Sequence, residues 1–147
     1  MFKRDVPVKA IRAAKIIVTE NQSRARPMIR ALTHAGFAVE VTRTGSETLA
    51  LAREDIDAVV LDINLPDVNG FEVCRQLKSQ AGTARIAVVF VSSTQDVAEA
   101  DMIASRLGAV AYLTKPVEAR DLVNVINLVI SKKDLHTQRS RGTAQSA

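Results

Sequence analysis

The sequence predicts a doubly wound α/β fold in which five parallel strands are covered by helices on both faces. Two observations lead to this prediction. Short apolar runs alternate five times with segments of helical periodicity, and each intervening segment is long enough for the right-handed crossover that parallel strands require. With 147 residues, 47% of them hydrophobic, the chain has enough apolar material for one core.

Each predicted strand is a short run rich in β-branched or other apolar residues. Because parallel strands are buried on both faces, their sequences are continuously apolar rather than alternating. The run Asp57-Ala58-Val59-Val60-Leu61-Asp62 has this pattern, bounded by turn residues. The five predicted strands are residues 15–19, 37–42, 57–62, 86–91 and 110–113.

The segments between the strands carry apolar residues at helical spacing. In the first segment Met28, Leu32 and Ala35 recur on one face, and Gly36 provides a C-cap. Pro27 fits only within the first turn of that helix. The predicted helices are residues 23–35, 46–54, 70–79, 95–107 and 118–131.

The net charge of +4 comes from the two ends of the chain. Residues 1–15 contain five basic residues against one acidic, and residues 132–147 contain four against one, so the middle of the chain is mildly acidic. Neither end interleaves basic with aromatic residues, and we expect no direct binding to nucleic acid or membranes. The prediction is a basic arm at residues 1–14, one domain at residues 15–131 and a disordered polar tail at residues 132–147.

Two further features bear on the cellular compartment. No apolar stretch is long enough for a signal peptide or a membrane span. The single cysteine, Cys74, excludes an internal disulfide and a multi-thiolate metal site. We expect a cytoplasmic protein in which Cys74 is a small packing residue on a helix.

Polar residues follow the predicted strands where a doubly wound sheet binds its ligands, just beyond the carboxyl ends of the strands. These residues are Glu20 and Asn21, Asp62 and Asn64, Ser92, and Lys115. Carboxylate and carbonyl oxygens suit Mg²⁺, and a lysine can pair with a phosphoryl oxygen. The residues therefore predict a site that handles phosphoryl groups.

Four segments at these strand ends together resemble the receiver domain of two-component response regulators. They are Ile17-Val18-Thr19-Glu20-Asn21, Leu61-Asp62 with Pro66 and Gly70, Val91-Ser92-Ser93, and Tyr112-Leu113-Thr114-Lys115-Pro116. The resemblance covers residues 15–131 and implies a flavodoxin-like sheet with strand order 2-1-3-4-5. It also implies an aspartate that accepts a phosphoryl group from a sensor histidine kinase or a histidine phosphotransfer protein. Such a domain is no enzyme beyond catalysing its own phosphorylation and dephosphorylation.

The resemblance implies a role for each matching residue. Asp62 matches the phosphoacceptor, Lys115 the lysine that pairs with the phosphoryl group, and Ser92 the hydroxyl residue that hydrogen-bonds it. Tyr112 matches the aromatic residue that turns inward on phosphorylation, and the Lys115–Pro116 bond matches one that is typically cis. The matching Mg²⁺ ligands are Glu20, Asn21, Asp62 and the backbone carbonyl of Asn64.

The chain departs from the family at the acidic pair. The family usually has two acids there, most often aspartates, whereas this chain has Glu20 and the neutral Asn21. Because fewer carboxylates attract Mg²⁺ less strongly, we expect a working but weakened metal site. One open alternative is a pseudo-receiver that docks partners without being phosphorylated. Another is a flavodoxin-like cofactor binder, but residues 20–24 lack the glycine its phosphate loop would need.

The resemblance implies that phosphorylation biases a two-state equilibrium. The result would be read at the surface of helix 95–107, strand 110–113 and helix 118–131. A downstream protein and a phosphorylation-dependent homodimer are both compatible with such a surface. No DNA-binding or enzymatic segment follows residue 131 in this sequence, and we expect either a stand-alone receiver, which we favour, or a fragment of a longer protein.

Overall fold

The computed structural model describes residues 13–20, 25–93 and 96–146, with side chains placed as far as Lys132. Nearly all of the expected basic arm lies outside these residues. Five parallel strands form one sheet in the predicted order β2-β1-β3-β4-β5. In chain order the elements are β1 (Lys15–Thr19), α1 (Arg26–His34), β2 (Ala38–Thr42), α2 (Gly45–Leu51), β3 (Ala58–Leu61), α3 (Gly70–Ser79), β4 (Ala87–Ser92), α4 (Val97–Arg106), β5 (Ala111–Thr114) and α5 (Ala119–Ser146).

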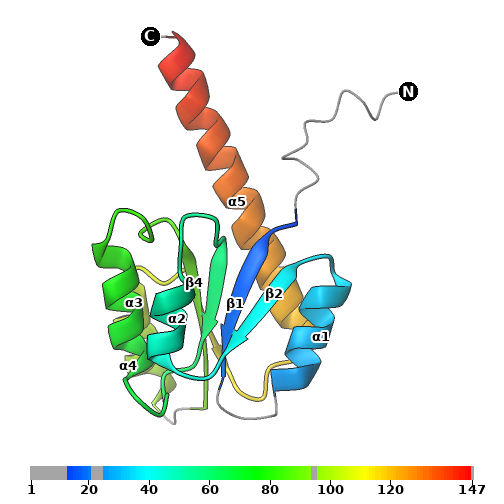
Figure 1. Cartoon of the computed structure of the whole chain (residues 1–147), viewed down its shortest axis with the longest axis vertical. Coiled ribbons are helices and arrows are strands. Elements are labelled where there is room, and N and C mark those ends of the chain that lie inside the picture. Colours follow the sequence, from blue (N-terminus) through cyan, green and yellow to red (C-terminus); the bar gives the residue numbers. More distant parts are fainter. Residues whose placement is uncertain (1–12, 21–24, 94–95, 147) are drawn as a thin grey trace.

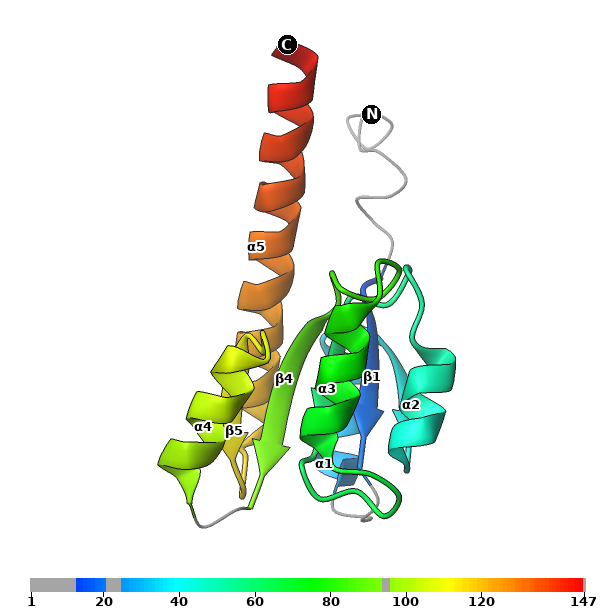
Figure 2. The same ribbon diagram turned by 90° about the vertical axis from the view of Figure 1, so that its left-hand side faces the viewer.

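The helices form a layer on each face of the sheet, as Figures 1 and 2 show, with α1 and α5 on one side and α2, α3 and α4 on the other. Successive residues of β1 therefore enter different cores. Ile16 and Val18 pack in a core with Leu32 of α1, whereas Ile17 packs in a core with Val73 of α3. Every residue of β3 and β4 is buried, which explains the continuous apolar runs in the sequence.

Two glycines end helices, and the sequence predicted the one at Gly36. Gly36 follows α1 with a φ of 99°, and Gly108 follows α4 with a φ of 92°. Both values lie in the left-handed region that glycine adopts without a steric penalty. Cys74 is fully buried in the core that contains Ile17 and Val73, called the second core below, in agreement with a packing role. Burial raises the pKa of its thiol.

Helix α5 continues to Ser146 and projects beyond the sheet, as Figures 1 and 2 show. This differs from the expected helix end at residue 131 and from the disordered tail expected after it. Burial of Leu122 and Ile126 anchors the start of α5, and once nucleated a helix extends at little cost. Residues 132–146 contain no proline and are rich in lysine, arginine and glutamine, which favour helix. None of the described helices combines the length and the apolar character needed to cross a membrane.

The first turn of α2 is capped by its N-cap residue and by a carboxylate from another loop. Thr44 Oγ1 accepts a hydrogen bond from the backbone N–H of Glu47 at 3.0 Å. Asp67, from the loop between β3 and α3, accepts bonds from the backbone N–H groups of Gly45 and Ser46 at 2.8 and 2.9 Å. These backbone bonds, together with one from the Ser46 hydroxyl, lower the pKa of Asp67 from 3.8 to about 2.

Replacement of Phe90 tests the packing of the second core. Phe90 is fully buried and meets the ring of Phe71 edge to face, with ring centroids 5.2 Å apart. We expect Phe90→Ala to lower the free energy of unfolding by about 3–5 kcal/mol, because the side chain leaves a cavity. Phe71→Ala, at a partly buried position, should cost clearly less. Urea unfolding followed by circular dichroism measures both, and equal losses would contradict this account of the core.

The carboxylate of Asp67 gives a prediction on pH. Because its pKa is lower in the folded chain than its usual 3.8, its contribution to stability is present above pH 3.8 and is lost as the pH falls toward about 2. The difference in unfolding free energy between wild type and Asp67→Asn should therefore be largest near neutral pH and shrink in acid. Denaturant unfolding across this range measures it, and a difference independent of pH would refute the capping role.

Candidate functional site

Three strands bring Glu20, Asp62 and Lys115 together at the carboxyl edge of the sheet. The Lys115 Nζ atom lies 2.7 Å from Glu20 Oε2 and 2.7 Å from Asp62 Oδ2. Glu20 and Asp62 follow the adjacent strands β1 and β3, whereas Lys115 follows β5, on the far side of β4. The lysine side chain therefore passes the end of β4 to reach Asp62, and the ends of both β4 and β3 to reach Glu20.

The two carboxylates lie in a poorly hydrated environment. Glu20 is 5% exposed and Asp62 is 7% exposed. Two buried negative charges this close would repel each other, and the ammonium group of Lys115 offsets that repulsion. Burial opposes protonation of Lys115, but its hydrogen bonds to Asp62 and Glu20 outweigh this effect and raise the pKa of Lys115. Lys115 is therefore a permanent cation at neutral pH.

The loop after Asp62 is closed by short-range backbone contacts. The backbone N–H of Asn64 donates to Asp62 Oδ1 at 3.1 Å, and the N–H of Gly70 donates to the carbonyl of Ile63 at 2.7 Å. A Cβ atom at position 70 would lie 2.1 Å from the carbonyl oxygen of Asp62, so only glycine allows α3 to begin this close to β3. The loop thus holds Asn64 beside the Asp62 carboxylate.

Strands β4 and β5 supply the other side of the site. Ser92 is fully buried at the end of β4, and its carbonyl accepts the backbone N–H of Lys115 at 2.8 Å. Tyr112 is partly buried against the second core. Burial raises the pKa of its hydroxyl, and the nearby charges of Asp101 and Asp62 add to the shift. The Lys115–Pro116 bond is cis, as the resemblance implied.

The donor atoms at this edge fit a hard divalent cation. Glu20 Oε1 is buried and, within the described residues, has no hydrogen-bond partner. A buried carboxylate oxygen left in this way costs free energy that a bound cation would recover. Glu20, Asp62 and the Asn64 carbonyl present oxygen only, which suits Mg²⁺. Asn21, the other predicted ligand, lies outside the described residues.

The described residues place two carboxylates, those of Glu20 and Asp62, together at this edge of the sheet. Across the part of the chain that the structure describes, no group of three or more acidic, histidine or cysteine side chains could hold a metal. Mg²⁺ commonly binds through one or two carboxylates and keeps several waters. The pair of Glu20 and Asp62 meets that requirement.

Three residues next to the site were not identified from the sequence. Asp67 and Gly45 join the loop after Asp62 to α2, and the hydroxyl of Thr48 on α2 contacts the end of β1. The Thr44-x-x-Glu47 spacing signals the start of a helix at this point. Nothing in the sequence indicates which loop the helix would contact.

Comparison with known proteins identifies relatives by sequence. The sequence model of the "Response regulator receiver domain" family matches residues 16–127. The curated protein "Response regulator SaeR" of Staphylococcus aureus is 36% identical over 107 residues, which are 71% of this chain and 45% of that protein. The chain therefore spans less than half the length of this relative.

Solved structures match in fold over most of the chain. A response regulator receiver domain protein from Clostridium thermocellum is 30% identical, with a TM-score of 0.75 over 83% of this chain and 98% of the other. A CheY-like receiver domain protein from Methanospirillum hungatei has a TM-score of 0.77 over 85% and 99% of the two chains, and at 22% identity it supports the fold alone. The strand order, the motifs at the strand ends and the family match agree, and the chain belongs to the receiver domain family of two-component response regulators.

Proposed function

We propose that the domain accepts a phosphoryl group on Asp62, with Mg²⁺ bound beside it. The donor would be the phosphohistidine of a sensor histidine kinase or of a histidine phosphotransfer protein. The observation that carries this proposal is the contact of Lys115 Nζ with both Glu20 and Asp62, at 2.7 Å each, on the carboxyl edge of the sheet. Phosphoryl transfer to an aspartate needs a carboxylate, a permanent cation and oxygen atoms available to bind a metal, all at one edge.

In the proposed reaction an oxygen of the Asp62 carboxylate attacks phosphorus. A new P–O bond forms while the P–N bond of the phosphohistidine breaks, and its electron pair goes to the imidazole nitrogen. When bound, Mg²⁺ supplies positive charge to the phosphoryl oxygens, and Glu20, Asp62, the Asn64 carbonyl and Asn21 would hold it. Lys115, which pairs with the free carboxylate, would pair with the phosphoryl group after transfer. The buried Ser92 hydroxyl would hydrogen-bond that group.

Tyr112 and the face formed by α4, β5 and α5 would report phosphorylation. Tyr112 packs against the same core as α4, so a change in the position of its ring would be felt by that helix. Apolar side chains are unusually exposed nearby: Val97 and Met102 of α4 by 41% and 49%, and Val110 before β5 by 52%. Such side chains suit a protein partner, either a downstream target or a second copy of the chain.

Chemical phosphorylation tests the proposal directly. With acetyl phosphate and Mg²⁺, intact mass spectrometry should show one added phosphoryl group on the wild-type chain, and Asp62→Asn should show none. Asp55→Asn removes a partly buried carboxylate that pairs with Lys15 before β3, away from the carboxyl edge, and should be phosphorylated like wild type. No added mass at any Mg²⁺ concentration would refute the proposed function and favour a non-phosphorylated docking module.

The neutral residue at position 21 gives a separate prediction. Asn21→Asp restores a second acid, and we expect Mg²⁺ affinity to rise by roughly tenfold, since an added carboxylate strengthens binding of a hard cation. Glu20→Gln should act in the opposite direction. Isothermal titration calorimetry with MgCl₂ measures all three proteins, and equal affinities for wild type and Asn21→Asp would show that this position does not limit the site.

A further inference from the structure

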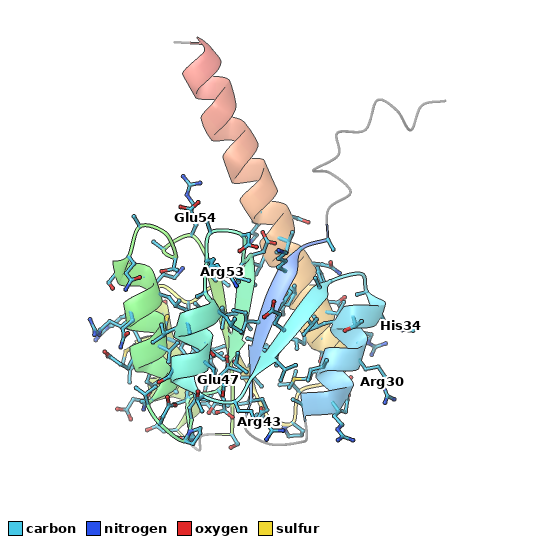
Figure 3. The ribbon with its side chains drawn as sticks, in the orientation of Figure 1. Arg30, His34, Arg43, Glu47, Arg53 and Glu54 are labelled. Atoms are coloured by element: carbon cyan, nitrogen blue, oxygen red, sulfur yellow. The ribbon has the colours of Figure 1, made fainter. Side chains whose placement is uncertain are left out.

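The first turn of α2 lies between the two chain segments that carry the acidic residues of the site. One segment is the loop from Asp62 to α3, and the other is the end of β1, where Glu20 follows. Figure 3 shows Glu47, in this first turn, at the edge where the strands end, whereas Glu54, just after α2, lies at the opposite edge. The turn contacts both segments.

Asp67 makes the contact on the loop side. Its carboxylate accepts hydrogen bonds from the N–H groups of Gly45 and Ser46 at 2.8 and 2.9 Å, and from Ser46 Oγ at 2.8 Å. Bonds to a charged acceptor are short and directional, so together they fix the loop against the helix. Gly45 makes this approach possible, because a Cβ there would lie 2.3 Å from Val68 Cγ1 and 2.8 Å from Val73 Cγ2.

Three buried threonines make the contact on the other side. The hydroxyls of Thr19, Thr42 and Thr48 all lie within hydrogen-bonding distance of one another, and each residue is at most 2% exposed. Thr48 Oγ1 also donates to the carbonyl of Thr44 at 3.0 Å. Glu20 directly follows Thr19, and its N–H donates to the carbonyl of Thr42 at 3.0 Å. The backbone from which the Glu20 side chain leaves is thus tied to α2 through hydroxyl groups.

We infer that Asp67 and Thr48 are positioning residues for the metal site, and that the first turn of α2 sets the spacing between Glu20 and the loop carrying Asp62 and Asn64. The inference rests on the Mg²⁺ site of the proposed function. Lys115 contacts both acids, but its long flexible stem cannot fix their separation. A turn bonded to both segments can, and Mg²⁺ demands near-ideal octahedral geometry from its ligands.

Two measurements on two variants test the inference. Asp67→Asn and Thr48→Val should each weaken Mg²⁺ binding by about tenfold in calorimetry, the scale found when the groups that orient metal ligands are removed. In metal-free protein Asp67→Asn should speed hydrogen exchange at the amides of Asn64 and Gly70, which close the loop. Thr48→Val should speed it at the amide of Glu20, which donates to the carbonyl of Thr42. Thr48→Ser keeps the hydroxyl and should restore both values toward wild type.

Matched controls separate positioning from stability and from charge. Thr83→Val removes a buried threonine hydroxyl that donates to the carbonyl of Leu77 at 2.6 Å, just after α3 and away from the carboxyl edge. Asp55→Asn removes a partly buried carboxylate paired with Lys15. Both controls should leave Mg²⁺ affinity and the exchange of the Glu20, Asn64 and Gly70 amides unchanged.

The outcomes distinguish this inference from the proposed function. Unchanged amide exchange in Asp67→Asn and Thr48→Val would overturn the inference, as would a loss of Mg²⁺ affinity that the two controls match. Faster exchange with wild-type Mg²⁺ affinity would also overturn it, since the turn would then position the two segments but not the ligands. If the wild-type chain binds no Mg²⁺, the proposed metal site fails, and amide exchange alone then decides whether α2 positions the two segments.

Discussion

The ammonium group of Lys115 between Glu20 and Asp62 is the interaction on which the site depends. Both carboxylates are more than nine-tenths buried, and without a cation between them their charges would repel in a medium that screens poorly. Lys115 makes the pair tolerable while leaving Glu20 Oε1 without a partner within the described residues. The two hydrogen bonds from Lys115 therefore stabilise the buried carboxylates in the folded chain. The remaining Glu20 oxygen is left able to bind a further cation.

The sheet topology explains why these residues meet. In the order β2-β1-β3-β4-β5 the direction of strand addition reverses between β1 and β3, and the crevice of a doubly wound sheet opens at such a reversal. Glu20 and Asp62 stand on the two sides of this point. The close approach of Gly70 to the Asp62 carbonyl brings α3 against the same edge and keeps the loop short. The acidic residues of the site therefore lie at the crevice of the sheet.

The sequence predicted the sheet well because its strands are continuously apolar, and it was less accurate where local bonding decides an element's end. Phe37 was expected to start β2, but its N–H donates to the carbonyl of Leu32 and completes the end of α1. Asp57 was expected within β3, but its side chain accepts the N–H of Lys15 before the strand begins. The length of α5 was missed because a polar segment without periodicity gives no sign of continuing an anchored helix.

For the site, too, the sequence predicted which residues lie at the edge of the sheet but not the contacts that hold them in place. Motif spacing and strand ends together pointed to Glu20, Asp62, Ser92 and Lys115, because topology alone collects such residues at one edge. The distances among these residues, and the contacts of Asp67 with α2, depend on packing between segments that are distant in the chain. Such packing cannot be predicted from a single sequence.

The neutral Asn21 gives these packing contacts added weight. A site with fewer carboxylates attracts a cation less by charge, so its affinity depends more on how well the remaining oxygens are placed before binding. In this chain the end of β1 is tied to α2 by buried hydroxyls, and the loop after Asp62 is tied to α2 by a carboxylate. If these contacts position the ligands as inferred above, a helix of only seven residues would help compensate for the missing charge.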